Sequence, residues 1–396
     1  MPNRGENLTR ARSKRRVDND ARIRRAATNT IAELGVDRVS MAEIARRSGL
    51  TTGALYGRFE SLDDLILDCW THQLSTRMFE VLDGARHQFL GSSDRSRWSD
   101  LGIGGAVTTA GLHVLLASRR NPVLGEGLER DLRDWSRKWE LDSEGEPTTR
   151  MRSAVATAFV LARLITPYLN IDEDDWDGMA EVFGEALLTS TSHSQSQLGT
   201  GLRVEAIGVD QLQCDLVNST MDVIARSGCE RSTLTRISRR AGCTTGAIYS
   251  RYESKTDLVV DAIEILVASA ARVSSQLVIQ GANSNAMSTS VARMFHTAVA
   301  REREVWNNFR LEVYLAASWD PSIRRCLRRV KQTSDDRYFA LLQPTRMFSD
   351  DLISQIAIAG QQIPLGLSAL AVFADGHREL DYLMLSQRLM ELCGAS

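Results

Sequence analysis

The chain carries one segment twice. Residues 31 to 65 and 224 to 258 align without a gap at an offset of 193 residues, with 18 identical residues in 35 positions. A match of this length excludes chance, and the offset is far longer than the repeat of a solenoid protein, which spans roughly 20 to 50 residues. We therefore infer that a whole domain is duplicated. A chain of 396 residues with 43% hydrophobic content has room for more than one buried core.

Charge is distributed unevenly along the chain, although the formal net charge is only -2. Residues 1 to 60 contain thirteen Lys or Arg and seven Asp or Glu, and residues 211 to 255 contain seven and four. These two segments carry +6 and +3, and the remainder carries -11. Positive charge at both repeated segments is typical of a surface that contacts phosphates on an otherwise acidic body. The alternative is that the N-terminal stretch is only a solvated tail.

Several other classes of protein leave patterns that this sequence lacks. Its six Cys and six His show neither metal-ligand spacing nor a disulfide framework, so we expect no metal site and no cofactor. The set of acid, base and nucleophile that an enzyme needs is not visible, which favours a non-catalytic protein. No stretch approaches the roughly 18 to 20 uninterrupted apolar residues of a membrane helix. The N-terminus lacks the apolar segment of a secretory signal, so we expect a cytoplasmic protein.

Hydrophobic periodicity predicts helices and no strands, so the expected fold class is all-α. In the first copy Gly35 ends a long helix, Ser40 caps a short second helix, and Gly49 ends it. Their counterparts in the second copy are Gly228, Thr233 and Gly242. Further helices are expected at 62–82, 100–119, 124–141, 149–170 and 173–189, and then at 256–280, 284–300, 303–318, 321–343, 350–373 and 378–393. Pro167 and Pro364 fall within these ranges and should kink the helices that contain them.

These patterns divide the chain into two similar halves. We expect a basic N-terminal arm, a first head, a first helical body, a polar linker, a second head and a second helical body, at residues 1–19, 20–66, 67–189, 190–210, 211–259 and 260–396.

Each head has the pattern of a helix-turn-helix motif, in which one helix enters a DNA major groove. Ala45 and Ser238 are small where the two helices would cross, and Gly49 and Gly242 can take a positive φ in the turn. The outward positions of the next helix hold short hydroxyls, glycines and a phenol, which allow close approach to bases and phosphates. In the first head these are Thr51, Thr52, Gly53, Tyr56 and Gly57, and in the second Thr244, Thr245, Gly246, Tyr249 and Ser250.

The segments TTGALYGRFESLDDL and TTGAIYSRYESKTDL resemble the end of the DNA-binding domain of the tetracycline-repressor (TetR) family. Members of that family join a three-helix DNA-binding head to a helical body that binds a small ligand and dimerises through its last two helices. The resemblance therefore implies this layout twice in one chain, with double-stranded DNA as the partner and repression as the usual outcome. It covers about 45 residues in each half by motif, and the bodies by length only.

Three positions depart from the family pattern. Arg58 and Arg251 stand where the family usually has His or Tyr, which keeps or strengthens a phosphate contact. The lysine that commonly follows the serine is present as Lys255 but is Leu62 in the first head, which would lose one phosphate contact. The basic arm, with Arg12, Arg15 and Arg16, would compensate as a disordered segment lying along phosphates or in a minor groove.

The bodies contain aromatic and polar residues that are candidates for an apolar effector pocket, although aromatic residues at helical spacing equally suit a core. These candidates are Trp70, His113, Trp135, Arg163, Tyr168, Trp306, Arg310 and Tyr314. A regulator that responds to no ligand is the alternative, and a helical interaction scaffold that no longer binds DNA is another.

One chain already owns two heads, so the simplest arrangement is an intramolecular pseudo-dimer. In this arrangement helices near 149–189 pack against helices near 350–393 as a four-helix interface. The alternative is that two chains associate and carry four heads.

The first prediction concerns the basic arm. Deleting residues 1 to 17 removes Arg12, Arg15 and Arg16, so fewer counterions are released when DNA binds. We expect a shallower slope of log binding constant against log salt concentration, measured by fluorescence anisotropy. An unchanged slope would refute a role for the arm.

Overall fold

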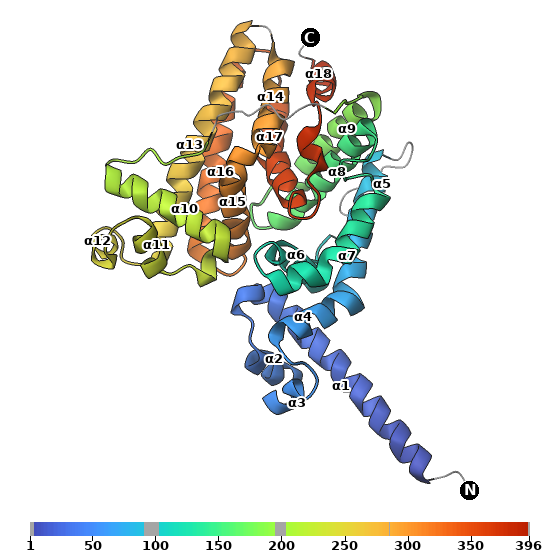
Figure 1. Cartoon of the computed structure of the whole chain (residues 1–396). Coiled ribbons are helices and arrows are strands. Elements are labelled where there is room, and N and C mark those ends of the chain that lie inside the picture. Colours follow the sequence, from blue (N-terminus) through green and yellow to red (C-terminus); the bar gives the residue numbers. More distant parts are fainter. Residues whose placement is uncertain (1–3, 91–102, 195–202, 285, 395–396) are drawn as a thin grey trace. The chain divides into compact units, whose positions relative to one another are not determined.

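The computed structural model describes residues 4–90, 103–194, 203–284 and 286–394 (Figure 1). Within these ranges the secondary structure is helical, and the one extended pairing is an isolated antiparallel bridge between Ser194 and Leu380. The predicted all-α fold is confirmed. The chain divides into two compact units, residues 1–79 with 104–128 and residues 80–103 with 129–396, which we describe separately.

The first unit contains the first head and one buried helix of the first body. Its helices are α1 (Arg4–Leu34), α2 (Met41–Ser48), α3 (Thr52–Tyr56), α4 (Leu62–Cys69) and α6 (Ala106–Ser118). A π-helical turn, Trp70–Leu74, leads from α4 into α5 (Ser75–Leu90). Helices α5 and α7 (Pro122–Lys138) continue from the first unit into the second.

The second unit contains the remaining helices of the first body and all of the second half. From the first body come α8 (Pro147–Ile165) and α9 (Glu173–Thr189). The second head follows with α10 (Gln211–Arg231), α11 (Leu234–Arg240) and α12 (Thr245–Tyr249). The second body is built from α13 (Lys255–Ser284), α14 (Met287–Val299), α15 (Glu304–Ala316), α16 (Pro321–Leu342), α17 (Asp350–Leu370) and α18 (Leu383–Leu392).

The structure corrects three details of the expected helices. Helix α8 ends at Ile165 instead of running to residue 170, because the proline ring of Pro167 disfavours helical backbone at Thr166. Pro167 therefore lies beyond the helix and does not kink it. The N-terminal arm was expected to be disordered, yet α1 begins at Arg4, in a stretch rich in Arg and Ala, which favour helix. Helix α18 begins at Leu383, later than expected.

In the first unit, α1 packs against α6. Helix α6 has the sequence AVTTAGLHVLLAS. Its own apolar residues lie on every side of the helix, as expected of a helix that is buried on all faces. An ion pair between Arg120 and Asp37 adds a polar fastening, with Nη1 of Arg120 2.8 Å from Oδ1 of Asp37 and both side chains almost fully buried. The loop after α1 is thereby tied to the residues that follow α6.

In the second unit, α10 packs against α15 and α13 in the same way. Their shared core includes Ile224, Ile263, Phe309 and Val313, all fully or almost fully buried. Both heads therefore rest their first helix on a later, buried helix of the body.

Helix α8 of the first body packs along α17 of the second body, and α9 packs against α17 and α18 (Figure 1). At the crossing of α8 and α17, a Cβ built on Gly366 would lie 1.7 Å from the carbonyl oxygen of Ala158. The two backbones are therefore in direct contact, which only glycine permits. At the other end, Arg388 of α18 donates to Thr189 at 3.1 Å and pairs with Glu185 of α9.

The beginning of the expected linker is fixed to the second body. Ser192 donates through its hydroxyl to the carbonyl of Asp381 at 2.7 Å, and the amide of Asp381 donates to the carbonyl of His193 at 2.9 Å. Residues 195–202 of the linker lie outside the described residues. Residues 190–194 of the expected linker therefore belong to the packed part of the second unit.

Within the described residues, one stretch, Lys255–Gly281 of α13, is long and apolar enough to cross a membrane by length and composition. In the structure 33% of this window is buried, and α13 packs against α10, α14 and α16.

The second prediction concerns the crossing of α8 and α17. Gly366→Ala adds a methyl group where the carbonyl of Ala158 already lies, so the helices must separate, and overpacking of this kind costs roughly 1 to 3 kcal/mol. We expect a lower midpoint of chemical denaturation. The control is Gly53→Ala in α3, where an added Cβ meets nothing within 4 Å. Equal midpoints for Gly366→Ala and the parent chain would show that α8 and α17 do not pack this closely.

Candidate nucleic-acid interface

The helix-turn-helix of the first head is set by hydroxyl caps and one left-handed glycine. The Ser40 hydroxyl oxygen accepts from the amide of Glu43 at 3.2 Å, and that of Thr51 accepts from the amide of Ala54 at 3.2 Å. Gly49 has a φ of 66°, a conformation that favours glycine. These local signals start α2, end it and start α3, as predicted from the sequence.

The second head repeats this geometry. The Thr233 hydroxyl accepts from the amide of Arg236 at 3.3 Å, and the Thr244 hydroxyl accepts from the amide of Ala247 at 3.2 Å. Gly242 has a φ of 69°. A hydroxyl that accepts as a cap still keeps its own hydrogen, so all four caps can also donate to a phosphate oxygen.

Helices α3 and α12 each have one buried side and one exposed side. Leu55 and Ile248 point into the core and are fully buried. Tyr56 and Tyr249, the next residues, are 58% and 62% exposed, which is unusual for a side chain with a large apolar ring. Both phenols are therefore available to a partner outside the head.

The other residues predicted to contact DNA are on the surface of their heads. In both heads the hydroxyl and glycine positions are exposed, except that Thr245 is half-buried; they are Ser40, Thr51, Thr52, Gly53, Gly57, Thr233, Thr244, Gly246 and Ser250. At these exposed positions the heads differ twice, where Ser40 corresponds to Thr233 and Gly57 to Ser250. The hydroxyl of Ser250 donates back to the carbonyl of Ala247 at 2.8 Å.

Gly53 and Gly246 have no structural reason to be glycine. Neither has a positive φ, and a Cβ on Gly53 would meet nothing within 4 Å. On Gly246 it would meet one atom, Oγ1 of Thr244, at an ordinary 3.6 Å. Glycine in a helix costs roughly 0.5 to 1 kcal/mol relative to alanine. What glycine does provide on an exposed helix is room for close approach by another molecule.

The arginines predicted to contact phosphates have partners within their heads. Arg58 donates to Oδ1 of Asp20 at 2.8 Å and to the carbonyl of Ala54 at 2.7 Å. Arg251 pairs with Asp210, the capping residue of α10. Each arginine thus fastens the end of α3 or α12 to the first helix of its head. A phosphate contact by either one stays a prediction.

Lys255 is also engaged. Its ammonium donates to the backbone carbonyls of Cys229, Glu230 and Ser232, at 3.0, 3.4 and 3.1 Å, so it holds the segment that follows the kink of α10 at Gly228 and leads into α11. In the first head, where Leu62 replaces Lys255, the ion pair between Arg120 and Asp37 fastens the equivalent loop. The first head, which has Leu62 in place of the lysine, thus uses an ion pair where the second head uses Lys255.

The two heads differ in charge at α2 and α11. In α2, Glu43 accepts from both Arg46 and Arg47, whose hydrogen bonds lower the pKa of Glu43 to about 2. In α11 an arginine, Arg236, stands at the position equivalent to Glu43, and the exposed Arg239 follows. The second head is therefore the more cationic on this helix. In the arm, Arg16 is exposed, and the side chains of Arg12 and Arg15 lie outside the described residues.

Sequence reasoning missed the acidic partners Asp20 and Asp210 and the fastening residue Arg120. Asp20 and Arg58 are separated by 38 positions, and Asp210 and Arg251 by 41. No local periodicity reports pairs so far apart. The two aspartates are not even at equivalent positions, so the alignment of the two halves could not reveal them.

Both heads match a known protein family. The family described as bacterial regulatory proteins, tetR family, matches residues 23–69 and 216–262, which are the two heads. The chain therefore carries two heads of this family in tandem.

The relatives are named as regulators. An uncharacterized HTH-type transcriptional regulator of Mycobacterium bovis is 36% identical over 92 residues, covering 22% of this chain and 49% of that protein. A Mycobacterium tuberculosis protein of the same description shows the same identity and coverage. Another such regulator from M. bovis is 37% identical over 59 residues, covering 15% of this chain and 30% of that protein. The chain thus spans about half the length, or less, of these relatives.

The residues predicted to line an effector pocket do not gather in one place in this chain. In the first unit, Trp70 packs edge-on against Phe79, and burial lowers the pKa of His113 to about 4, so its ring is neutral at neutral pH. In the second unit, Trp135 donates to Asp83 at 2.8 Å, and Arg163 pairs with Glu173.

The second body does bring three of the predicted residues together. Trp306, Arg310 and Tyr314 of α15 line one cavity. The hydroxyl of Tyr168 donates to the carbonyl of Tyr314 at 2.8 Å, although Tyr168 is not among the lining residues of that cavity. A ligand-contacting role for any of the eight residues stays a prediction.

The third prediction follows from the two exposed glycines. Gly53→Ala and Gly246→Ala should leave stability unchanged or slightly raised, because the added methyl meets no close neighbour and alanine favours helix. DNA affinity should fall, by roughly tenfold for each head, because the methyl occupies space that a groove would need. Denaturation and anisotropy titrations measure the two effects separately. Full affinity in the double variant would contradict close approach at these glycines.

Proposed function

We propose that the chain is a sequence-specific, DNA-binding transcriptional regulator, with repression as its action and the cytoplasm as its location. One observation carries this proposal. Both heads expose the same threonine, glycine and tyrosine on α3 and α12, although folding requires neither the glycine nor an exposed phenol. The family match and the names of the relatives point to a regulator and not to an enzyme.

The exposed surfaces suit the chemistry of a duplex. Hydroxyls that cap a helix and a phenol beside them can donate to phosphate oxygens, whereas the glycine admits the backbone of α3 or α12 close to base edges. The two heads would contribute unequally, since α11 carries Arg236 and Arg239 where α2 carries a neutralised Glu43 and Arg46. The cationic arm before the first head would offset this difference.

We further propose that the two heads of a single chain read the two half-sites of one operator. The packing of α8 and α9 against α17 and α18 supports this, because a helical interface between two bodies is what an ordinary family member makes with a second chain. In this chain the two bodies are covalently joined. The heads differ at Gly57 and Ser250, so the half-sites need not be identical.

A scaffold that no longer binds DNA is the competing function, and the exposed glycines weigh against it. A scaffold would gain stability from alanine at Gly53 and Gly246 and would lose nothing by the change. A ligand-blind regulator is compatible with the heads as described. It differs only in what the second body does.

The fourth prediction tests both the function and the assembly. Genomic fragments bound by the full chain are selected and sequenced, and the tightest is titrated while light scattering measures the mass of the complex. We expect a site with two half-sites and a complex of one chain per site. The competitor for specificity is a fragment of equal length with both half-sites scrambled.

Two results would count against the proposal. Equal affinity for the scrambled fragment would refute sequence-specific binding. Two chains per single site would refute the pseudo-dimer while leaving DNA binding intact. A reporter gene placed behind the selected site then distinguishes repression from activation.

A further inference from the structure

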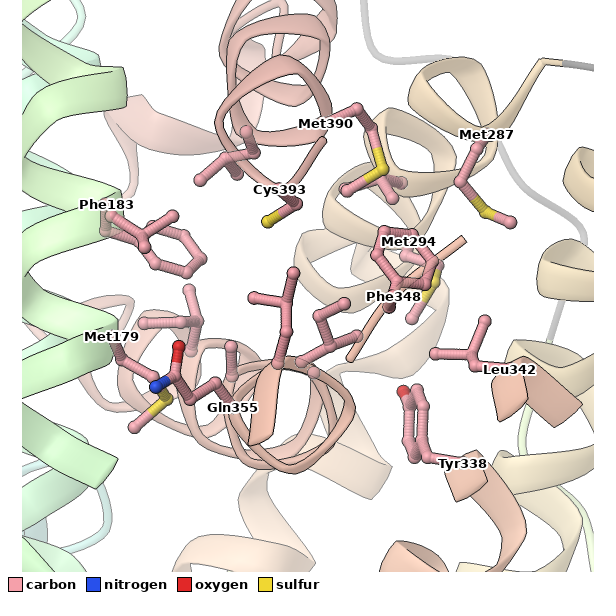
Figure 2. A pocket seen from close by; sticks show the side chains of 18 of the residues that line it. Met179, Phe183, Met287, Met294, Tyr338, Leu342, Phe348, Gln355, Met390 and Cys393 are labelled. Carbon is pink, nitrogen blue, oxygen red and sulfur yellow. The ribbon is translucent and has the colours of Figure 1, made fainter. Parts of the chain in front are cut away.

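The second unit contains an apolar cavity between the two bodies, which we call the tail chamber. It has a volume of about 110 Å³ and is lined by side chains of α9, α13, α14, α16, α17 and α18. Figure 2 shows Phe183, Phe348, Met294 and Met390 around it, with few polar atoms nearby. Helix α9 belongs to the first half of the chain and all the others to the second. The tail chamber is therefore complete only when both halves pack together.

A second cavity, the head chamber, lies within the second body. It has a volume of about 130 Å³, and its walls are made by α13 to α17. Three arginines line it, Arg303, Arg310 and Arg337, and no Asp or Glu is among its lining residues. Aromatic rings of Trp306 and Tyr314 complete the wall.

The two chambers adjoin each other. Five residues line both, namely Val278, Met294, Tyr338, Gly360 and Pro364. A Cβ on Gly360 would lie 2.5 Å from the hydroxyl oxygen of Tyr338, so glycine leaves the space that this hydroxyl occupies at the shared wall. The shared wall thus has an apolar chamber on one side and a chamber lined by arginines on the other.

Burial in the head chamber disfavours the charged form of its arginines. Arg310 donates to the carbonyl of Gln361 at 3.2 Å, and its guanidinium lies 5.7 Å from the Trp306 ring centre, but neither partner is an anion. Burial lowers the pKa of Arg310 and lowers that of Arg303 to about 10, an effect to which the charge of Arg310 adds. Desolvated like charges repel each other, and an anion placed between them would offset both penalties.

From these observations we propose that the two chambers form one binding site for an amphipathic anion. Its acidic group, such as a carboxylate, would pair with Arg310 and its neighbours, and its apolar chain would fill the tail chamber. The inference rests on the proposed function, because it names the effector class of that regulator. It also assigns one such site to each chain, with a wall contributed by the first half.

The fifth prediction uses octanoate and 1-octanol, which have the same tail and differ in the charge of the head group. Calorimetric titration of the full chain, without DNA, should give one octanoate per chain and binding about tenfold tighter than that of 1-octanol. Arg310→Met removes the charge and keeps an unbranched apolar side chain. It should weaken octanoate by about tenfold and leave 1-octanol within about threefold.

Two further variants locate the site. Arg325→Met, on the exposed side of α16, is the matched control and should change neither affinity. Val182→Phe, on α9, narrows the tail chamber from the side of the first half, so it should weaken octanoate and 1-octanol alike. Thermal unfolding of each variant verifies that the chain is folded.

Several outcomes would overturn the inference: equal binding of octanoate and 1-octanol, an Arg310→Met variant that keeps its preference for octanoate, or no effect of Val182→Phe on either probe. DNA binding is titrated separately in the absence of octanoate. A chain that binds DNA and ignores octanoate would refute this site and leave the regulator standing. A chain that binds octanoate and no DNA would support this site and refute the proposed DNA-binding function.

Discussion

The backbones of helices α8 and α17 are in direct contact, and the packing of the two bodies in the second unit depends on that contact. Gly366 lets the carbonyl of Ala158 approach to a distance that any side chain would forbid. Around it, α9 lies against α17 and α18, so the end of the first half is covered by the end of the second. Two separate chains would lose translational and rotational freedom on forming such an interface, a cost estimated at 4 kcal/mol or more. A covalent linker raises the effective concentration of the two faces instead.

The two heads show what duplication preserved and what it allowed to change. Their exposed residues on α3 and α12 are nearly the same, while their internal supports differ. Lys255 holds a loop in the second head that the pair of Arg120 and Asp37 holds in the first. Arg58 and Arg251 are equivalent in sequence but pair with aspartates at non-equivalent positions. Different internal contacts thus present the same outward surface, as we expect if that surface is what the proposed function requires.

Much of this fold could be predicted because its signals are local. Ser40, Thr51, Thr233 and Thr244 cap helices within three residues of themselves, and a glycine at Gly49 needs only its own backbone to adopt a positive φ. Helix boundaries followed from such signals and from periodicity to within a few residues for most elements.

The contacts between distant segments could not be predicted in this way. Three of the eight proposed pocket residues, Trp306, Arg310 and Tyr314, share a cavity, because they lie one turn apart on one helix and so face the same side. Trp135 and Arg163 were equally plausible by composition, yet each found an acidic partner within the fold. Periodicity identifies the buried face of a helix but not the helix that covers it. For the same reason Gly366 gave no signal in the sequence.

Helix α15 occupies a position from which a ligand could act on the second head. One side of α15 supplies Trp306, Arg310 and Tyr314 to the head chamber, and other residues of the same helix, such as Phe309 and Val313, form the core shared with α10. A ligand shifts an equilibrium only by the difference in its affinity for the two states, so α15 would have to move when an anion draws the arginines together. Because packed cores resist gradual deformation, such a shift would carry α10, and with it α12, as a unit.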